Sequence, residues 1–406
     1  MKIGEFSKKF NVKRDTIRYY IETGLLLPEK IRNQYIFDES CIKDMKEIIE
    51  LKNLKFTISG IQKIFSLKRM TNLTDISDID FYLSFFENKK QELLKEKEKI
   101  EKALNIIEEK ISYINTSLKN KEKKIGIPLQ FINYLVCPKC NKPLELNNAT
   151  IKKNYIFTGE LNCDCGYHAQ INKGIIITPE ADTSEIPEYE KKGKTLLNMY
   201  DQSLLTLMEK GGIWIYKRLF NIGVKNKVIM EIGTGLGRFV KNSMVNMGKD
   251  TLYIATEKSL DSLKTLKNSL ELAGSNANIV FIAGDYTKCP IKSESIDIVI
   301  DYFGTRNYLL KNSFYPVEKV SNFLKKDGIW IGTFTYYENH AKSLKNYAEK
   351  TRNLLLFESI KNSFTKNSIK KLESSELGFS LKMGEIEKTH IPGDKLHVWA
   401  FLGKKI

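Results

Sequence analysis

The sequence predicts a multidomain protein: a winged helix-turn-helix that is mainly α, a long coiled-coil helix, a small cysteine-rich ribbon and an α/β Rossmann-like domain. Three observations predict this order. Apolar residues recur in heptads over residues 81–119, two cysteine pairs follow, and strands alternate with helices from about residue 195. A chain of 406 residues is long enough for several domains, which we place at residues 1–75, 76–124, 128–182 and 190–406.

The composition is that of a folded protein, with 42% apolar and 28% charged residues. No stretch approaches the roughly 18 consecutive apolar residues of a membrane span, and the first residues lack the apolar run of a secretory signal. We therefore expect a cytoplasmic protein with no membrane partner. The net charge of +16 suggests polyanionic partners, although charge alone does not locate a nucleic-acid site.

The first 70 residues show two short helical patterns separated by a turn at Asn11, and the second opens with Lys13 and Arg14. A basic stretch at residues 32–37 follows and is able to form a β-wing. Such a pair of helices can present the second one to the major groove of DNA. On spacing alone, a small helical domain with a solvated basic face fits equally well.

Specific motifs favour the first interpretation. Residues 16–20 (Thr-Ile-Arg-Tyr-Tyr), 24–26 (Gly-Leu-Leu) and Pro28 resemble the start of MerR-family winged-helix regulators, and residues 54–61 are similar to the family's Leu-Gly-Phe-Ser-Leu-x-Glu-Ile. The resemblance implies double-stranded promoter DNA as a partner. It implies that the recognition helix and wing contact DNA through Lys13, Arg14, Thr16, Arg18, Tyr19, Arg32, Asn33 and Tyr35. The family usually has Gly-Tyr-Arg in the wing where this chain has Gln-Tyr-Ile at residues 34–36, so one phosphate contact is missing.

Residues 81–119 carry the heptad pattern. Apolar side chains recur every seven residues at Phe86, Leu93, Ile100, Ile107 and Ile114. Charged side chains between them leave only a narrow apolar stripe, which favours a two-stranded coiled coil over a helix packed on its own domain. The MerR resemblance implies an antiparallel pairing, and therefore a homodimer.

Four of the six cysteines form two close pairs, with 22 residues between the pairs. The metal ligands that we expect are Cys137, Cys140, Cys163 and Cys165. Two such pairs suit one tetrahedral Zn²⁺, which would stabilise a segment too small to have its own core. His168 is able to replace one thiolate, and four unrelated buried cysteines are the alternative. The surrounding residues look like the zinc ribbons that precede some bacterial methyltransferase domains.

The strands of the C-terminal segment end in glycines or acids. Residues 227–230 lead into Glu231-Ile232-Gly233-Thr234-Gly235-Leu236-Gly237, residues 251–255 lead to Glu257, and residues 279–282 lead to Asp285 and Tyr286. Later strands are expected at 296–300, 328–333 and 396–402. Alternating strands and helices form an open parallel sheet that binds ligands at the C-terminal ends of its strands.

The glycine spacing separates two classes of cofactor. A dinucleotide site needs Gly-x-Gly-x-x-Gly, whereas this loop is Gly-x-Gly-x-Gly followed by Arg238. S-adenosylmethionine has no pyrophosphate, and glycines let the backbone approach such a ligand closely. An acid at the position of Glu257 can accept both ribose hydroxyls, Asp285 suits the adenine amino group, and Tyr286 can pack on the ring.

Residues ~195–406 resemble the class I S-adenosylmethionine-dependent methyltransferases in the order and spacing of these motifs. The resemblance implies a cofactor site formed by Glu231, Gly233, Thr234, Gly235, Gly237, Glu257, Asp285 and Tyr286.

The catalytic residues are less defined. Residues 301–308 do not read Asn/Asp-Pro-Pro-Tyr, which argues against methylation of an exocyclic amino group in nucleic acid. Methyl transfer depends largely on positioning, so no fixed catalytic set is required. Asp301 and His340 are the candidate general bases. The aromatic-rich residues 336–364 either cover an acceptor pocket or form an ordinary surface helix.

Two hypotheses of different classes follow. The first is a MerR-type transcription regulator whose C-terminal domain binds S-adenosylmethionine and methylates or senses a small molecule such as an antibiotic. The second is an enzyme that methylates RNA or a small molecule, with a DNA-binding head that regulates its own expression. A third hypothesis is that the pocket no longer binds the cofactor and only senses drugs.

Overall fold

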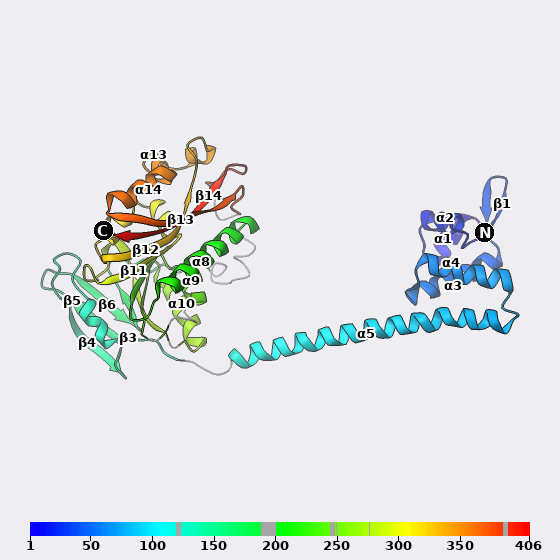
Figure 1. Ribbon diagram of the computed structural model, residues 1–406, viewed down its shortest axis with the longest axis horizontal. Helices are drawn as coiled ribbons and strands as arrows, with labels where there is room; N and C mark the ends of the chain where they lie inside the picture. The colour runs from blue at the N-terminus through cyan, green and yellow to red at the C-terminus, as the bar shows by residue number, and fades with distance from the viewer. Residues whose placement is uncertain (119–122, 188–199, 244–247, 249, 276, 385–388) are drawn as a thin grey trace. The chain divides into compact units, whose positions relative to one another are not determined.

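The computed structural model describes residues 1–118, 123–187, 200–243, 248, 250–275, 277–384 and 389–406 (Figure 1). The chain divides into two compact units, residues 1–117 and 118–406. The expected start of the Rossmann-like domain at residue 190 lies outside the described residues, as do residues 119–122 of the expected coiled-coil segment. No helix among the described residues is both long enough and apolar enough to cross a membrane.

The N-terminal unit begins with the expected pair of short helices. Helix α1 (Ile3–Phe10) ends at Asn11, whose φ of 51° turns the chain, and α2 (Arg14–Glu22) follows. Phe6 of α1 and Ile17 of α2 are both fully buried in one core. The two helices are therefore fixed against each other by their apolar faces, and the polar face of α2 is left at the surface.

A β-hairpin follows the helix pair, as expected for a wing. Strands β1 (Glu29–Ile31) and β2 (Gln34–Ile36) pair in antiparallel fashion. The two residues that join them, Arg32 and Asn33, have φ values of 45° and 64°. Two consecutive positive φ values are typical of a type I′ turn, which matches the twist of a hairpin.

Helices α3 (Glu39–Asn53) and α4 (Ile58–Thr71) complete the core of this unit. Each has an N-cap: the Asp38 carboxylate accepts from the Cys41 amide at 2.9 Å, and the Thr57 hydroxyl accepts from the Gly60 amide at 3.1 Å. Arg69 of α4 donates to the carbonyls of Gly24 and Leu25 at 2.7 Å each, which holds the turn after α2.

Helix α5 (Ile76–Leu118) is the longest element, with 43 residues. Phe86, near its start, packs against Phe56 with ring centroids 5.5 Å apart, whereas the central members of the heptad stripe are each 52 to 55% exposed. They are Ile100, Leu104, Ile107, Ile111 and Ile114.

The C-terminal unit is built on one mixed sheet of 12 strands. The Rossmann-like part has the order β13-β14-β12-β11-β8-β9-β10, and its five parallel strands therefore follow the 3-2-1-4-5 order of doubly wound sheets. These five are β8 (Val228–Ile232), β9 (Leu252–Glu257), β10 (Asn278–Ala283), β11 (Ile296–Tyr302) and β12 (Leu324–Tyr336).

One end of this sheet differs from the parallel arrangement that the sequence predicts. Strand β14 (Leu396–Lys405) runs antiparallel to β12, and β13 (Ile369–Ser380), which the strand pattern did not predict, pairs antiparallel with β14. Charged and polar residues fill much of β13, whose middle is largely exposed, so it lacks the apolar run of a buried strand.

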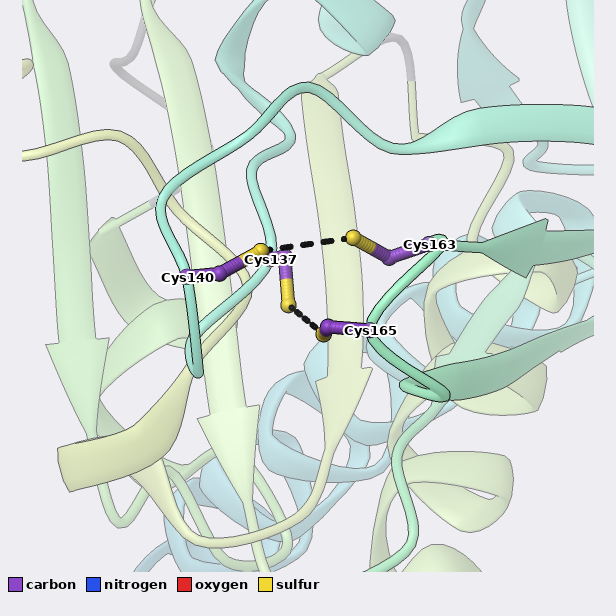
Figure 2. A group of neighbouring side chains, drawn as sticks. All are labelled: Cys137, Cys140, Cys163 and Cys165. Atoms are coloured by element: carbon purple, nitrogen blue, oxygen red, sulfur yellow. Dashed lines mark hydrogen bonds between the residues drawn. The ribbon is translucent and has the colours of Figure 1, made fainter.

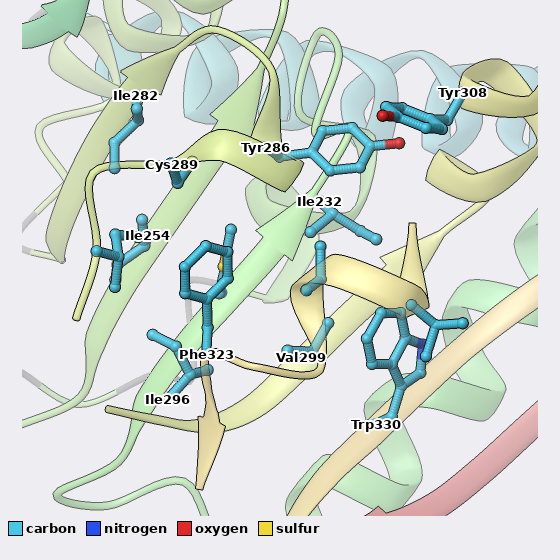
Figure 3. Close-up of a cluster of buried hydrophobic side chains, with 14 of the residues drawn as sticks. Ile232, Ile254, Ile282, Tyr286, Cys289, Ile296, Val299, Tyr308, Phe323 and Trp330 are labelled. Carbon is cyan, nitrogen blue, oxygen red and sulfur yellow. The ribbon is translucent and has the colours of Figure 1, made fainter. Parts of the chain in front are cut away.

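Helices cover both faces of the Rossmann-like part (Figure 1). They are α8 (Gln202–Ile222), α9 (Arg238–Ser243), α10 (Leu260–Leu272), α11 (Gly304–Leu309), α12 (Val317–Val320), α13 (Glu349–Arg352) and α14 (Phe357–Lys366), with 3₁₀ turns η3 (Tyr286–Lys288), η4 (Lys342–Asn346) and η5 (Asn353–Leu355). Figure 3 shows one of the resulting cores, in which Ile232, Ile254 and Ile282 from three neighbouring strands belong to the same buried cluster as Tyr286.

The cysteine-rich segment extends the same sheet. It contributes β3 (Ile127–Pro128), β4 (Glu145–Lys152), β5 (Tyr155–Asn162), β6 (His168–Asn172) and β7 (Ile175–Ile177), with η1 (Leu129–Tyr134) after β3. Strand β7 pairs in parallel with β10, so that Ile176 lies beside Ile282. Residues 128–182 and 190–406, which the sequence analysis treats as two domains, therefore contribute to one continuous sheet.

The residues that follow the long helix are fixed to helix α10. Glu271 is only 4% exposed and accepts from the Ile125 amide at 2.7 Å. Its carboxylate also pairs with the buried ammonium of Lys267 and, at 3.5 Å, with that of Lys124. A buried carboxylate is stable only when it is paired and hydrogen-bonded, and these contacts supply both.

Candidate functional site

The glycine loop lies at the C-terminal end of β8. Gly233, Gly235 and Gly237 have φ values of 64°, 56° and 76°. A Cβ on Gly233 would lie 2.9 Å from the Cα of Gly304, and one on Gly304 would lie 2.3 Å from the Ile232 carbonyl oxygen. The ends of β8 and β11 therefore meet backbone to backbone. Gly235 has open space where its side chain would be, which leaves room for a ligand.

The Glu257 carboxylate holds this loop from the end of β9. Its Oε2 accepts from the Gly235 amide at 3.0 Å and its Oε1 accepts from the Ser259 amide at 3.1 Å. A carboxylate has about four lone-pair positions, so each oxygen keeps one for a further donor. The glycine loop and Glu257, which the sequence analysis places in one site, are thus joined by a direct hydrogen bond.

The third predicted segment lies at the end of β10. The Gly284 amide donates to the Glu257 carbonyl at 2.9 Å, which brings Asp285 next to the end of β9. Thr287 donates to Oδ1 of Asp285 from its amide at 3.0 Å and from its hydroxyl at 2.7 Å. Among the described residues these bonds engage only Oδ1, so Oδ2 is available to a ligand.

Tyr286 is directed inward. Its side chain is 6% exposed, its hydroxyl donates to the Gly304 carbonyl at 3.2 Å, and its ring lies 5.1 Å from that of Tyr308 (Figure 3). It supports the strand ends from below and offers little surface to a ligand ring.

Glu231 is buried beneath the loop and is 1% exposed. The Tyr253 hydroxyl donates to its Oε2 at 2.7 Å. The pKa of Glu231 is raised to about 8, chiefly by burial; the hydrogen bonds from Tyr253 and Thr234 lower it, and the nearby charges of Glu257 and Asp301 add to the rise. Near neutral pH its carboxyl is therefore largely protonated. Thr234 itself is buried and donates from its amide to the Thr256 carbonyl at 3.0 Å.

The two candidate general bases have different surroundings. Asp301, at the end of β11, is fully buried, and burial raises its pKa to about 7. Its Oδ1 accepts from the Thr305 amide at 2.9 Å and its Oδ2 from the Thr305 hydroxyl, so it caps the start of α11. His340 is 84% exposed, beyond the end of β12, and its Nε2 lies 3.2 Å from a Glu338 carboxylate oxygen.

The four paired cysteines converge from two loops (Figure 2). Their Sγ atoms all lie within 4.8 Å of one another, with 3.4 Å between Cys137 and Cys165 and between Cys140 and Cys163. Four thiolates at about 2.3 Å from a tetrahedral Zn²⁺ would be about 3.8 Å apart, so the cluster is able to hold a metal ion. His168 is instead hydrogen-bonded through Nδ1 to the Asn162 side chain at 2.7 Å.

The predicted DNA contacts lie on one helix and one hairpin of the N-terminal unit. On α2 and its N-cap, Lys13, Arg14, Arg18 and Tyr19 are exposed and Thr16 is half-buried, while Ile17 and Tyr20 face the core. In the wing, Arg32 and Asn33 form the exposed turn and Tyr35 is half-buried.

A buried polar network above β11 and β12 was not predicted. The Arg306 guanidinium donates to the Thr335 hydroxyl at 3.2 Å and to the Tyr347 hydroxyl at 3.0 Å, and the Tyr337 hydroxyl bonds His390 Nδ1 at 3.0 Å. Arg306 lies on α11 and Thr335 on β12, whereas Tyr337 and Tyr347 come from the aromatic-rich segment after β12 and His390 from the β13–β14 connection. The only sequence signal was the aromatic content of residues 336–364, because the contacts span more than 25 residues of chain.

The buried carboxyl of Glu231 predicts a dependence of stability on pH. Since its pKa is raised in the folded state, the folded chain binds a proton that the unfolded chain has lost between about pH 4.5 and 8. The free energy of unfolding should fall through this range as pH rises, by up to about 1.4 kcal/mol per pH unit from this group. The Glu231→Gln variant should lose this component. All three tryptophans (Trp214, Trp330, Trp399) lie in the C-terminal unit, so urea denaturation followed by their fluorescence measures it.

The control is Glu294→Gln, which changes a carboxyl that is 67% exposed. Its pH profile should match that of the wild type. Parallel profiles for the wild type and Glu231→Gln would contradict the prediction.

One family model matches the N-terminal part of the chain. Residues 1–68 match the family model described as MerR HTH family regulatory protein. A search of the curated proteins found no match.

Several solved methyltransferase structures resemble the chain at low similarity. Phosphoethanolamine N-methyltransferase 2 from Haemonchus contortus, in complex with phosphomonomethylethanolamine and S-adenosylhomocysteine, is 15% identical with a TM-score of 0.38, over 48% of this chain and 52% of that one. The chain thus spans about half the length of that protein. An S-adenosylmethionine-dependent methyltransferase from Aquifex aeolicus is 14% identical with a TM-score of 0.38, over 54% of this chain and all of that one. Residues 1–68 are a MerR-type helix-turn-helix domain, and they precede a mixed α/β unit of Rossmann-like fold.

Proposed function

We propose that the protein is a cytoplasmic, dimeric transcription regulator of the MerR type whose C-terminal domain binds S-adenosylmethionine and methylates or senses a small molecule. The observation that carries this proposal is the Glu257 carboxylate, held at the edge of the glycine loop by the Gly235 amide in a chain that also has a MerR-type domain. The two backbone amides that donate to Glu257 hold its side chain in place, and the remaining lone pairs of the carboxylate can accept from a ligand.

The cofactor assignment is supported by the polar groups at three strand ends. Glu257 would accept from both ribose hydroxyls, and Oδ2 of Asp285 would accept from the adenine amino group. The open space at Gly235 would admit the ligand close to the backbone. Bound there, S-adenosylmethionine would supply a methyl group on a sulfonium, while Asp301 would hold the start of α11 in place through Thr305.

Replacement of Glu257 by alanine should abolish or strongly weaken this binding. Each hydrogen bond to a charged group contributes about 1.5–3 kcal/mol, so loss of both should weaken S-adenosylhomocysteine binding by at least about a hundredfold. Titration calorimetry on the full chain measures the effect, with Glu358→Ala as a control at a carboxyl that is 71% exposed. No binding to the wild type would refute the cofactor assignment.

The DNA-binding part of the proposal is supported by the polar face of α2. Ile17 and Tyr20 anchor the helix, which would leave Arg14, Arg18 and Tyr19 to enter a major groove while the wing turn reaches the backbone. Arg18 is paired only with a neighbouring exposed acid, Asp15, at 2.8 Å among the described residues. An exposed pair of this kind is weak, so the guanidinium is easily transferred to DNA.

The Arg18→Ala variant should therefore bind its promoter about tenfold more weakly. If the side chain contacts a phosphate, the slope of log affinity against log salt should also fall by about 1. Footprinting and fluorescence anisotropy on the promoter of its own gene test this. Lys63→Ala, at an exposed position on α4, removes the same charge away from α2 and should leave the affinity unchanged.

The homodimer is supported by the apolar stripe of α5. Half-exposed isoleucines and leucines at heptad spacing are a surface that a second helix would cover. A hollow of about 310 Å³ beside it, lined by Leu54, Phe56, Phe86 and Leu93 together with lysine stems, would receive side chains of a partner.

The Ile107→Glu variant should be monomeric, because a charge in the stripe would be buried against apolar side chains in the dimer. Light scattering coupled to gel filtration should give twice the chain mass of 46.9 kDa for the wild type and one chain for the variant. The control is Glu108→Gln, which changes the next residue of the helix, outside the heptad stripe. A monomeric wild type would refute the dimer.

The four-cysteine cluster would bind Zn²⁺ in a structural role. Its four thiolates leave no open position for a substrate, which is typical of structural rather than catalytic zinc.

An alternative function is methylation of RNA or of a small molecule by the C-terminal unit, with the DNA-binding head limited to autoregulation. The observation that favours it is the direct pairing of β7 with β10, which joins the cysteine-rich segment to the cofactor-binding sheet. Transfer of labelled methyl groups to RNA, combined with DNA binding at its own promoter alone, would favour this alternative.

A further inference from the structure

Two of the four histidines in the chain converge on one carboxylate. The Glu338 side chain lies with one oxygen 3.2 Å from Nε2 of His340 and the other 3.4 Å from Nε2 of His397. Glu338 and His340 follow the C-terminal end of β12, and His397 lies near the start of β14, which is paired to the end of β12. Long-range strand pairing therefore brings three metal-ligating groups together.

The His397 ring is held in one orientation. Its Nδ1 lies 3.3 Å from Oε1 of Glu376 on β13, and Oε2 of the same carboxylate accepts from the Tyr336 hydroxyl at 3.0 Å. The ring also stacks on Tyr336 at a centroid distance of 4.8 Å. A carboxylate on Nδ1 fixes the tautomer that carries its lone pair on Nε2.

That Nε2 atom is buried and makes no hydrogen bond to any residue that the structure describes. It faces Glu338 at a distance of 3.4 Å, but without hydrogen-bond geometry. A buried ring nitrogen without a hydrogen bond costs free energy, so its orientation toward Glu338 points to a ligand between the two side chains.

The cluster borders a cavity beside the residues that lead into β14. Glu338 and His340 line a cavity of about 370 Å³, and their side chains are 45% and 84% exposed. The same cavity is lined by Asp394 and by two lysines, Lys342 and Lys395. An ion bound to Glu338 would be reachable from solvent and would have room for further ligands.

We propose that Nε2 of His340, Nε2 of His397 and the Glu338 carboxylate bind a divalent transition-metal ion, with Glu376 as the positioning residue that orients His397. Two imidazoles and one carboxylate form the protein ligand set of open zinc sites, and imidazole favours zinc, iron and nickel over calcium and magnesium. The exposed His340 ring is able to rotate toward the ion. This site is separate from the four-cysteine cluster and does not depend on what the glycine loop binds.

Metal stoichiometry of the full-length chain tests the proposal. After dialysis against zinc and then metal-free buffer, mass spectrometry of the metal should give two zinc ions per chain. The His340→Ala and His397→Gln variants should each give one. Glu376→Gln should keep both sites but bind the second ion about tenfold to a hundredfold more weakly, as is typical for the hydrogen-bond partner of a ligating histidine.

Cobalt separates the two sites, because only the cysteine cluster gives a thiolate-to-cobalt charge-transfer band. In His340→Ala this band should remain while the absorption of the nitrogen- and oxygen-bound ion disappears. The matched control is Glu373→Gln, on the same strand as Glu376 but paired with Arg218. It should leave both metals in place.

His340 is so exposed that its replacement should not affect folding, so this variant decides the question. A wild type that holds only the thiolate-bound ion would overturn the proposal. A second ion that persists in His340→Ala and His397→Gln with unchanged affinity would overturn it equally.

Discussion

The close contact between Gly233 and Gly304 is the constraint on which the C-terminal unit depends. It brings two strand ends so close that neither position has room for a Cβ. Three neighbouring features are positioned by this contact. They are the loop after β8, the capped start of α11, and the ring of Tyr286, whose hydroxyl donates to the Gly304 carbonyl. A methyl group on Gly233 or Gly304 would displace backbone atoms rather than a flexible side chain. The groups around this contact therefore have little freedom to move.

Buried acids surround this contact. Glu231 and Asp301 are buried beneath the strand ends, and Glu257 is half-buried with both oxygens bound by amides. The two buried carboxyls are protonated more readily than usual, whereas Glu257 has fixed donors and access to solvent. Acidic residues therefore have two roles at this site. The fully buried ones support the loop from below, and the less buried Glu257 offers acceptor oxygens to a ligand.

Local patterns were sufficient for much of this architecture. The helix pair, the wing, the paired cysteines and the glycine loop each depend on residues within a short stretch of sequence. The Glu257–Gly235 bond follows because neighbouring parallel strands end at one edge. Strand β13 was missed because its exposed lysines, glutamates and serines have no apolar pattern. Tyr253 beneath Glu231, the Arg306 network and the convergence of His340 and His397 on Glu338 depend on strand pairing over 20 to 60 residues, which no local pattern records.

The pairing of β7 with β10 has a consequence for how such a chain is assembled from parts. Strand β10 is almost wholly buried, and β7 pairs with the amides and carbonyls along one side of its residues 281–283. Without the cysteine-rich segment, these residues would form an exposed apolar edge, through which sheets of separate molecules can join and aggregate. The cysteine-rich segment therefore protects this edge of the sheet from pairing with another molecule. Truncation at residue 182 would expose this edge, so the cysteine-rich segment and the Rossmann-like part form one structural unit.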